Sequence, residues 1–272
     1  GHPLKRRHSE IMHNAAFEHF SIDARYELHE MEPNDIPAFV AEARSPGWYG
    51  FQVTAPYKQV IMGHLDAIES GAREIGAVNS VLRREDGSLV GFNTDAPGFQ
   101  RAAEGELAIR FSGLRVGVAG AGGVARAVVH ALVAAGADLV TICDIEPSRA
   151  EDLAADFGHG VRAVPVGDSF EEELRRVGFA VNATTVGMIE PGVAFDPDAL
   201  QDSAVVFDLV YNPPESDLLR RARARSLPAS NGLGMLIAQA EIAFERWTGE
   251  PGAGPIMRAA LAAEPLSDQL GG

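Results

Sequence analysis

The sequence predicts an α/β protein of two domains, in which an N-terminal α/β domain is followed by a doubly wound parallel sheet. Three observations lead to this prediction. The 272 residues are enough for two domains of ordinary size. Up to about residue 97, short helical and strand patterns are mixed and include a hairpin. From about Gly98 onward, short apolar runs alternate with amphipathic stretches, as in the strand–helix–strand units of a parallel sheet.

The first domain is expected to contain several short elements. Apolar residues spaced three and four positions apart predict helices, whereas strict alternation of apolar and polar residues predicts strands. By these criteria helices lie at 13–19, 36–44, 56–65 and 70–75, and strands at 24–29 and 49–54. Residues 80–92 are typical of a β-hairpin, because Asp86-Gly87 supplies turn residues between two apolar runs.

The second domain is expected to repeat one unit, a buried strand followed by a helix. The strands are predicted near 115–119, 138–143, 161–164, 179–182 and 204–208. The helices are predicted at about 123–135, 147–157, 169–176 and 215–225. Two further helical patterns, 235–247 and 254–263, follow toward the C-terminus.

The first strand–helix turn of the second domain carries a phosphate-binding pattern. The apolar run 116–119 ends in Gly120-x-Gly122-x-x-Ala125 and passes directly into a helical pattern. In a Rossmann-like fold the first glycine permits the tight turn, the second lets a pyrophosphate approach the backbone, and the small third residue lets helix and strand pack closely. The helix N-terminus offers free N–H groups to the anion. Glycines also mark ordinary strand–helix turns, so the pattern alone leaves that alternative open.

An acidic residue supports the dinucleotide interpretation. Asp144 follows the second predicted strand, about twenty residues after the glycines, where a carboxylate can accept hydrogen bonds from the adenosine ribose. Asp144 is also placed to cap the next helix, and the two roles are compatible.

Charge and cysteine content exclude several classes of function. The chain has 23 basic and 38 acidic residues and a net charge of −15, which disfavours nucleic-acid binding. No apolar run is long enough for a membrane span, and the basic start (Lys5, Arg6, Arg7) lacks the apolar stretch of a secretory signal. The single cysteine, Cys143, excludes an internal disulfide and favours a cytoplasmic location. The eight histidines show no ligand spacing, so no metal is expected.

Six segments, in order and at fitting spacing, resemble the shikimate dehydrogenase family. They are residues 1–14, 50–58, 75–80 with 91–95, 120–123, 182–188, and 208–211 with 232–236. The segments that carry Lys58 and Asn93-Thr94-Asp95 are together the most specific. The resemblance covers nearly the whole chain.

The resemblance implies both the division into domains and the activity. Residues 1–97 and 236–272 would form the substrate-binding and catalytic domain, and residues 98–235 the dinucleotide-binding domain. The implied reaction is reversible hydride transfer between NAD(P) and 3-dehydroshikimate or shikimate, and some relatives also use quinate. The expected partner is therefore a small cyclic hydroxy acid, with no nucleic acid or membrane, and the protein is expected to be a monomer or homodimer.

The resemblance places catalysis on Lys58 and Asp95. Ketone reduction needs a proton at the oxygen that gains charge. A lysine can supply positive charge and a proton, while an aspartate can hold the substrate hydroxyl. Which of the two transfers the proton is left open. Without the resemblance, an ordinary surface salt bridge would be the preferred explanation of the pair.

The remaining site residues are carried over from the family motifs. Thr54, Asn79 and Gln239 would bind substrate hydroxyls, since amides and hydroxyls can both donate and accept. Ser9 would bind the substrate carboxylate, and Tyr211 would make a further substrate contact. The implied cofactor residues are Gly120, Ala121, Gly122, Gly123, Val124, Asp144, Arg149, Thr184, Val210 and Gly234.

Two departures from the family motifs concern the substrate. Where the family has His-Ser-x-Ser-Pro, this chain has Arg7 in place of the first serine and keeps the second as Ser9. Arg7 can clamp the carboxylate bidentately, can obstruct the pocket or admit another acid, or can point to solvent. The usual Asn-Val-Thr is Gln52-Val53-Thr54, which adds one methylene beside the site.

The third departure concerns the cofactor. NADP-using relatives typically carry Asn-Arg-Thr where this chain has Asp144-Ile145-Glu146. Two carboxylates repel a 2′-phosphate, so NAD is predicted to be preferred over NADP. NAD-preferring relatives often oxidise quinate, which makes an NAD-dependent quinate/shikimate dehydrogenase the first alternative. A non-catalytic ligand-binding protein of the same family is the second.

Overall fold

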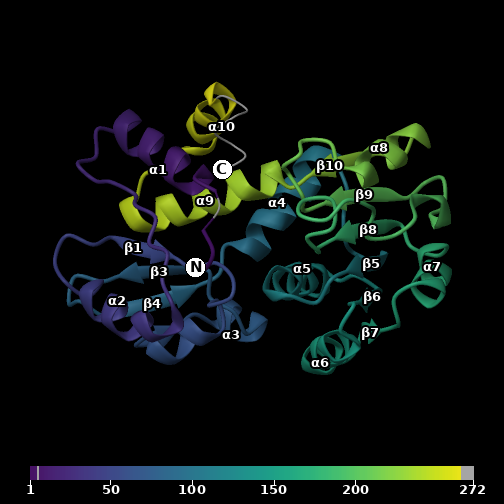
Figure 1. Ribbon diagram of the computed structural model, residues 1–272, viewed down its shortest axis with the longest axis horizontal. Helices are drawn as coiled ribbons and strands as arrows, with labels where there is room; N and C mark the ends of the chain where they lie inside the picture. Colours follow the sequence, from purple (N-terminus) through teal and green to yellow (C-terminus); the bar gives the residue numbers. More distant parts are fainter. Residues whose placement is uncertain (5, 265–272) are drawn as a thin grey trace. The chain divides into compact units, whose positions relative to one another are not determined.

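The computed structural model describes residues 1–4 and 6–264 (Figure 1). Lys5 and residues 265–272, the end of the segment assigned to the first domain, lie outside the described residues. The chain divides into two compact units, one formed by Gly1–Asp95 with the segment from Ile237 onward, the other by Ala96–Leu236. The divisions therefore follow residues 95 and 236, where the sequence suggested 97 and 235. The α/β class and the parallel sheet of the second unit are confirmed.

The first unit contains a four-stranded sheet in the order β1-β3-β4-β2. Its strands are β1 (Gly50–Gln52), β2 (Ala67–Ile68), β3 (Ser80–Arg83) and β4 (Leu89–Phe92). The predicted hairpin is present as β3 and β4, and its Gly87 adopts a φ of 83°, which a glycine tolerates at no steric cost. The sequence did not predict β2, since two residues are too short to show a period. The helices of this unit are α1 (His8–His19), η1 (Pro33–Asp35), α2 (Ile36–Glu42), η2 (Val60–His64), α3 (Ser70–Ile75), most of α9 (Leu233–Thr248) and α10 (Gly254–Ala263).

The predicted strand at 24–29 is wrong. The segment does alternate, with Ala24, Tyr26 and Leu28 half-buried and the residues between them exposed. However, its backbone joins no ladder of the described sheets. Instead, the side chain of Asn14 on α1 accepts from Tyr26 N at 2.7 Å and donates to Tyr26 O at 3.0 Å. One amide therefore replaces a neighbouring strand, which the alternation pattern cannot reveal.

The helix predicted at 56–65 is only a short 3₁₀ helix, η2. Its predicted first turn is held by a tertiary contact instead, because the carbonyl of Lys58 accepts from Val78 N at 2.8 Å. A carbonyl that accepts this tertiary hydrogen bond does not take part in the regular hydrogen-bond pattern of a helix. The apolar spacing therefore predicted correctly which side chains are buried, as Tyr57 and Ile61 show. It did not predict the backbone conformation of the segment.

The second unit is a six-stranded parallel sheet in the order β10-β9-β8-β5-β6-β7. The chain starts at β5, runs outward through β6 and β7, and then returns to β8 on the other side of β5. The carboxyl ends of β5 and β8 therefore form the switch point at which such sheets bind ligands. Figure 1 shows α5 and α6 on one side of the column of strands, and α7 and α8 on the other. The elements are α4 (Asp95–Leu107), β5 (Arg115–Ala119), α5 (Gly123–Ala134), β6 (Leu139–Cys143), α6 (Pro147–Phe157), β7 (Val161–Ala163), α7 (Asp168–Leu174), β8 (Phe179–Asn182), η3 (Pro197–Ala199), β9 (Val205–Asp208), α8 (Asp217–Ala224) and β10 (Ala229–Asn231).

Three elements of the second unit were not predicted: α4, the short 3₁₀ helix η3 and β10. The sequence pattern places a change at about Gly98, but Gly98 lies within α4, whose first turn also contains Pro97, at a position where proline is tolerated. β10 is a three-residue strand paired with β9 only.

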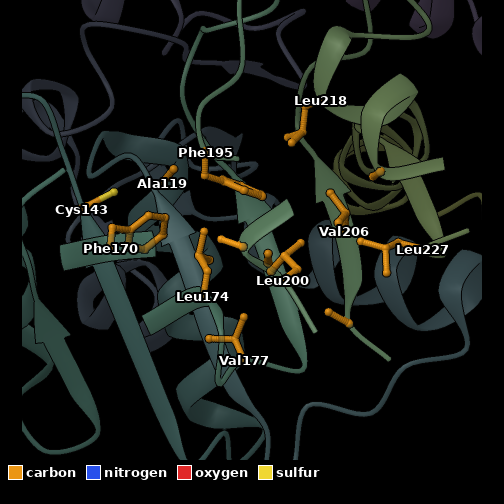
Figure 2. Close-up of a cluster of buried hydrophobic side chains, with 14 residues drawn as sticks. Ala119, Cys143, Phe170, Leu174, Val177, Phe195, Leu200, Val206, Leu218 and Leu227 are labelled. Carbon is orange, nitrogen blue, oxygen red and sulfur yellow. The ribbon is translucent and has the colours of Figure 1, made fainter. Parts of the chain in front are cut away.

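A buried apolar cluster anchors one face of this sheet. Figure 2 shows Phe170 and Leu174 of α7 beside Ala119 and Cys143, with Val206 of β9 and Leu218 of α8 farther along the same cluster. Burial of such side chains stabilises the sheet by roughly 2 kcal/mol each, and it fixes the strand ends that carry the polar residues described below. Among the residues that the structure describes, no helix is long and apolar enough to cross a membrane.

Candidate functional site

Lys58 and Asp95 form a close ion pair in the first unit. Lys58 Nζ donates to Asp95 Oδ2 over 2.6 Å, and only 16% and 9% of the two side chains are exposed. Lys58 lies in the turn after β1, and Asp95 begins α4 directly after β4. A pair this deeply buried is not an ordinary surface salt bridge, because little water screens it.

Backbone contacts hold both residues. Besides the bond from Val78 N to the Lys58 carbonyl, the side chain of Asn93 accepts from Asp95 N at 2.9 Å. Asn93 in turn donates to the carbonyl of Ala77 at 3.0 Å. The segments of Lys58 and Asp95 are thus both tied to residues 77 and 78, just before β3. A proton-carrying ammonium and a carboxylate are held together with little freedom to move.

A buried polar cluster lies in the same unit. Asn79 Nδ2 donates to Thr94 Oγ1 at 2.9 Å, and Asn79 Oδ1 accepts from Thr94 N at 2.8 Å. Thr94 Oγ1 lies 3.3 Å from Oε1 of Gln239, on α9. All three side chains are buried, so their hydrogen bonds are made within the protein. The structure therefore brings together Asn79 and Gln239, which lie 160 residues apart in the chain.

Sequence reasoning missed part of this cluster. Gln52 Nε2 donates to Gln239 Oε1 at 2.8 Å, and Tyr26 Oη donates to Gln52 Oε1 at 3.0 Å. The ring of Tyr26 is stacked on that of His13 with centroids 4.6 Å apart. Burial raises the pKa of the Tyr26 phenol and lowers the pKa of His13 to about 4. The sequence signal that could have identified Tyr26 is its inward position in the alternating segment 24–29.

The predicted carboxylate-binding residues lie at the start of α1. Ser9 is half-buried and hydrogen-bonds the phenol of Tyr26, which partly opposes the rise in pKa that burial causes. Arg7 precedes the helix with 70% of its side chain exposed, and its Nε lies 2.7 Å from Oε2 of Glu10. Thr54 is exposed, beyond the end of β1. Of the three open interpretations of Arg7, this geometry favours a side chain directed to solvent.

The glycine turn in the second unit has the form required to hold a phosphate. Gly120 has a φ of 105°, and a Cβ there would lie 2.8 Å from the Ala183 carbonyl oxygen. Gly122 precedes α5, caps it with no side chain, and would have nothing within 4 Å of a Cβ. The space beside Gly122 at the start of α5 is therefore open, as a pyrophosphate held by helix N–H groups would require. The neighbouring predicted residues are Ala121, Gly123 and Val124.

Asp144 is joined to this turn. Its Oδ2 accepts from Ala121 N at 2.7 Å, and its Oδ1 accepts from Glu146 N at 2.9 Å. Glu146, not Asp144, stands at the N-cap of α6, so the proposed capping role is wrong. Arg149 pairs with Glu146 at 2.8 Å, and Ile145 is 89% exposed. The end of β6 thus presents two carboxylates, with its nearest arginine already paired.

A buried carboxylate ties the loops after β8 and β9. Asp208 Oδ1 accepts from Asn182 Nδ2 at 2.8 Å and from Val210 N at 3.0 Å, while its Oδ2 accepts from Ser216 Oγ at 2.5 Å. Asn182 Oδ1 then accepts from Thr184 Oγ1 at 2.7 Å. Burial raises the pKa of Asp208. The network holds Thr184 and Val210, two predicted cofactor residues, at fixed positions, and sequence reasoning did not identify Asp208 as its centre.

The other predicted residues of the second unit lie in the loops after β8 and β9 and at the start of α9. Gly232, just after β10, donates its N–H to the carbonyl of Val210 at 3.2 Å. A Cβ at Gly234 would lie 2.0 Å from Oε1 of Glu106, so a larger residue there would require the Glu106 side chain to move. Tyr211 is half-buried in the loop after β9. All ten predicted cofactor residues thus belong to the second unit, together with Tyr211, whereas the other predicted substrate residues belong to the first.

Comparison with known proteins agrees with this arrangement. The family model described as the shikimate dehydrogenase substrate binding domain matches residues 1–81. The model of the shikimate 5'-dehydrogenase C-terminal domain matches residues 232–262. Between them, residues 115–208 match the model described as NADP oxidoreductase coenzyme F420-dependent.

Individual shikimate and quinate dehydrogenases are similar to this chain over nearly its whole length. The shikimate dehydrogenase (NADP(+)) of Symbiobacterium thermophilum is 41% identical over 97% of this chain and 92% of its own length. The shikimate 5-dehydrogenase of Thermus thermophilus, solved with NADP(H) and shikimate, is 37% identical with a TM-score of 0.86 over 97% of each chain. The quinate dehydrogenase of Corynebacterium glutamicum, solved with NAD, is 32% identical with a TM-score of 0.88 over 96% of each chain. This chain therefore belongs to the shikimate dehydrogenase family.

Proposed function

We propose that the protein interconverts 3-dehydroshikimate and shikimate by NAD(P)-dependent hydride transfer. The observation that carries the proposal is the buried ion pair of Lys58 and Asp95, which lies in the same unit as the polar cluster around Asn79 and Gln239. The similarity to shikimate dehydrogenases over nearly the full chain supports the same activity.

In this proposal Lys58 and Asp95 handle the proton. In the reducing direction a hydride adds to the ketone carbon, its oxygen gains negative charge, and one proton completes the alcohol. The ammonium of Lys58 stabilises the developing charge and carries a transferable proton, while Asp95 holds the lysine and accepts from a substrate hydroxyl. In the oxidising direction the same pair removes the proton.

The choice of lysine at position 58 is informative in this chain. Only two of its 23 basic residues are lysine, Lys5 and Lys58, and the others are arginine. A guanidinium keeps its protons in proteins, whereas an ammonium can exchange one. A lysine at the ion pair therefore supports proton transfer in addition to charge.

Polar side chains of the first unit would bind the rest of the acid. Asn79, Thr54 and Gln239 offer amide and hydroxyl groups to the ring hydroxyls, and Ser9 offers a hydroxyl to the carboxylate. Tyr211 would also contact the acid, as the family motif implies. We assign Arg7 no direct contact with the carboxylate, since its exposed side chain pairs with Glu10.

The nicotinamide dinucleotide, when bound, supplies or accepts the hydride. Gly120–Val124 would hold the pyrophosphate through backbone N–H groups, because Gly122 leaves open space before α5. Thr184 and Val210, on loops that the Asp208 network fixes, would line the nicotinamide together with Gly234 at the start of α9. Asp144 would accept hydrogen bonds from the adenosine ribose.

We infer a preference for NAD over NADP. The carboxylates of Asp144 and Glu146 would repel a 2′-phosphate, Ile145 offers it no charge, and Arg149 is already paired with Glu146. The named shikimate dehydrogenase relatives use NADP, so the inference concerns this chain's own residues. The NAD complex of the similar quinate dehydrogenase makes NAD-dependent oxidation of quinate the second candidate function.

One assay tests these proposals together. Absorbance of the reduced nicotinamide at 340 nm is followed with shikimate and with quinate, each with NAD and with NADP. Oxidation of shikimate, with higher kcat/KM for NAD, is the expected result. A higher kcat/KM with NADP would overturn the cofactor preference alone, and turnover of quinate in place of shikimate would favour the second candidate. Binding of shikimate without any turnover would favour a non-catalytic family member.

We also propose that the protein acts in the cytoplasm as a monomer or homodimer. Cys143, the only cysteine, is free and buried, and burial raises its pKa to about 12, so it is a poor partner for disulfide exchange. Light scattering during size-exclusion chromatography would determine the number of subunits, and microscopy of a tagged chain would determine the location.

A further inference from the structure

A hydrogen-bond network centred on Asp208 lies at the carboxyl ends of β8 and β9. Asp208 Oδ1 accepts from Asn182 Nδ2 at 2.8 Å and from Val210 N at 3.0 Å, and its Oδ2 accepts from Ser216 Oγ at 2.5 Å. Asp208, Asn182 and Ser216 are all buried. Water therefore cannot replace a partner that one of them loses.

The network requires Asp208 to be a carboxylate. Ser216 Oγ already accepts from Leu219 N at 3.2 Å at the start of α8, so its single proton is directed to Asp208 Oδ2. The other two neighbours, Asn182 Nδ2 and Val210 N, can only donate. Burial raises the pKa of Asp208, and these three hydrogen bonds act in the opposite direction. A neutral amide at position 208 would turn an NH2 group toward Ser216 and leave the serine proton without an acceptor.

Asn182 connects Asp208 to the loop after β8. Its Nδ2 donates to Asp208 and also to the carbonyl of Val186 at 3.1 Å, so its Oδ1 must face Thr184. That oxygen accepts from Thr184 N at 2.9 Å and from Thr184 Oγ1 at 2.7 Å. Thr184 Oγ1 in turn accepts from Val186 N at 3.1 Å. The hydroxyl proton of Thr184 is thus used within the protein, where it holds the loop in place.

The strand order indicates which half of a dinucleotide this loop would face. Asp144, proposed to bind the adenosine ribose, follows β6 on one side of β5, whereas β8 and β9 lie on the other side. A Cβ at Gly120 would lie 3.1 Å from Thr184 Cγ2, so the loop after β8 passes beside the glycine turn. A dinucleotide with its pyrophosphate at that turn and its adenosine over β6 would extend its nicotinamide toward β8 and β9.

We propose that Asp208 is a positioning residue for the nicotinamide half of the dinucleotide. It acts through Asn182 on the loop of Thr184, and through the N–H of Val210 on the loop after β9. The inference rests on the proposed function, which places the nicotinamide at Thr184 and Val210. It adds that both loops depend on one carboxylate, which is fully buried and contacts no ligand itself. The adenosine half would not depend on it, because Asp144 is joined directly to the glycine turn.

The test compares a whole dinucleotide with the fragment of it that lacks nicotinamide. Isothermal titration calorimetry measures the Kd of the full-length parent and of Asp208→Asn for NADH and for ADP-ribose. If the parent prefers NADP, the pair is NADPH and the 2′-phosphate of ADP-ribose. We expect Asp208→Asn to raise the Kd for the dinucleotide about five- to tenfold, the effect of one net hydrogen bond, and the Kd for the fragment less than about twofold. Equal loss toward both ligands, or no loss toward either, would overturn the proposal, because a merely structural carboxylate does not distinguish the two halves.

Two variants of Thr184 decide the question even if Asp208→Asn does not fold. Valine has nearly the shape of threonine but lacks the hydroxyl bonded to Asn182, so Thr184→Val should show the same selective loss toward the dinucleotide. Serine keeps that hydroxyl, so Thr184→Ser should stay within about twofold of the parent. The reverse order would show that the methyl group matters and the bond to Asn182 does not, which would overturn the proposal.

Phe170→Leu is the control for loss of stability alone. Phe170 is buried in the apolar cluster of the second unit, away from the hydrogen bonds of Asp208, so this variant should lower the Tm and leave both Kd values unchanged. A selective loss as large as that of Asp208→Asn would overturn the proposal. A parent that binds neither ligand would overturn the proposed function and this inference together. A parent that binds both, with the same ratio of Kd values in Asp208→Asn and Thr184→Val, would overturn this inference alone.

Discussion

Lys58 Nζ and Asp95 Oδ2 lie 2.6 Å apart and are almost fully buried, although 37 residues separate them in the chain. Lys58→Ala should lower kcat about 100- to 10,000-fold, the usual contribution of a positioned proton-transfer group. Lys58→Arg keeps the charge but not the exchangeable proton, so it should be similarly impaired. Steady-state kinetics with shikimate would check both variants, and substantial activity in Lys58→Arg would show that charge alone is needed.

Ile145→Arg should improve the use of NADP. It places a cation between Asp144 and Glu146, at an exposed position where a 2′-phosphate is otherwise repelled. We expect kcat/KM for NADP to rise about tenfold relative to NAD, by roughly the energy of one charge-assisted hydrogen bond. Ala262→Arg, exposed on α10, adds the same charge elsewhere and should leave the ratio unchanged. An unchanged ratio of kcat/KM for NADP to that for NAD in Ile145→Arg would show that the 2′-phosphate does not bind beside residue 145.

Gly120 and Gly122 should respond differently to alanine. Gly120→Ala combines a φ of 105° with a Cβ 2.8 Å from the Ala183 carbonyl oxygen, and should destabilise the protein by roughly 1–3 kcal/mol. Gly122→Ala meets no protein atom within 4 Å, so it should leave the Tm unchanged while raising the KM for the dinucleotide. Thermal unfolding and kinetics would distinguish the two. An unchanged cofactor KM in Gly122→Ala would argue against a pyrophosphate at this turn.

His13 should make the protein less stable in mild acid. Its folded pKa of about 4 lies below the usual value of 6.5, because burial disfavours the charged ring. The unfolded chain therefore binds more protons below pH 6.5, and stability falls as the pH drops from about 6.5 toward 4. The loss between pH 7.5 and 4.5 should be about 2–3 kcal/mol.

Denaturant unfolding of His13→Asn at both pH values would measure this effect. The variant should lose that part of the pH dependence, whatever its absolute stability. His159→Asn, at an exposed position, serves as the matched control and should behave like the parent. A parent and a His13→Asn variant with the same pH dependence would contradict the prediction.

Arg7 and Ser9 offer a direct test of carboxylate binding. Arg7→Ala should change the KM for the acid less than twofold, because its side chain is 70% exposed and paired with Glu10, and exposed pairs contribute little. Ser9→Ala should raise that KM several-fold by removing one hydrogen bond. The opposite order of effects would show that Arg7, not Ser9, holds the carboxylate.

Local sequence patterns were sufficient for most of the second unit. Five of the six strands, the glycine turn and Asp144 follow from short periodic segments, because each strand–helix unit is built from neighbouring residues. The errors lie where a long-range contact replaced a local one. Asn14 took the place of a strand partner for Tyr26, and Val78 diverted the carbonyl of Lys58 from a helix.

The sequence by itself determined the α/β class, the family and the identity of most candidate site residues, because these depend on residue types at fixed spacings. Only the tertiary structure decided how those residues interact. It buried the pair of Lys58 and Asp95, turned Arg7 toward Glu10, and joined Gln52 to Gln239 across 187 residues. The direction of a hydrogen bond and the burial of a side chain depend on residues from distant segments of the chain. A local sequence pattern does not specify those residues.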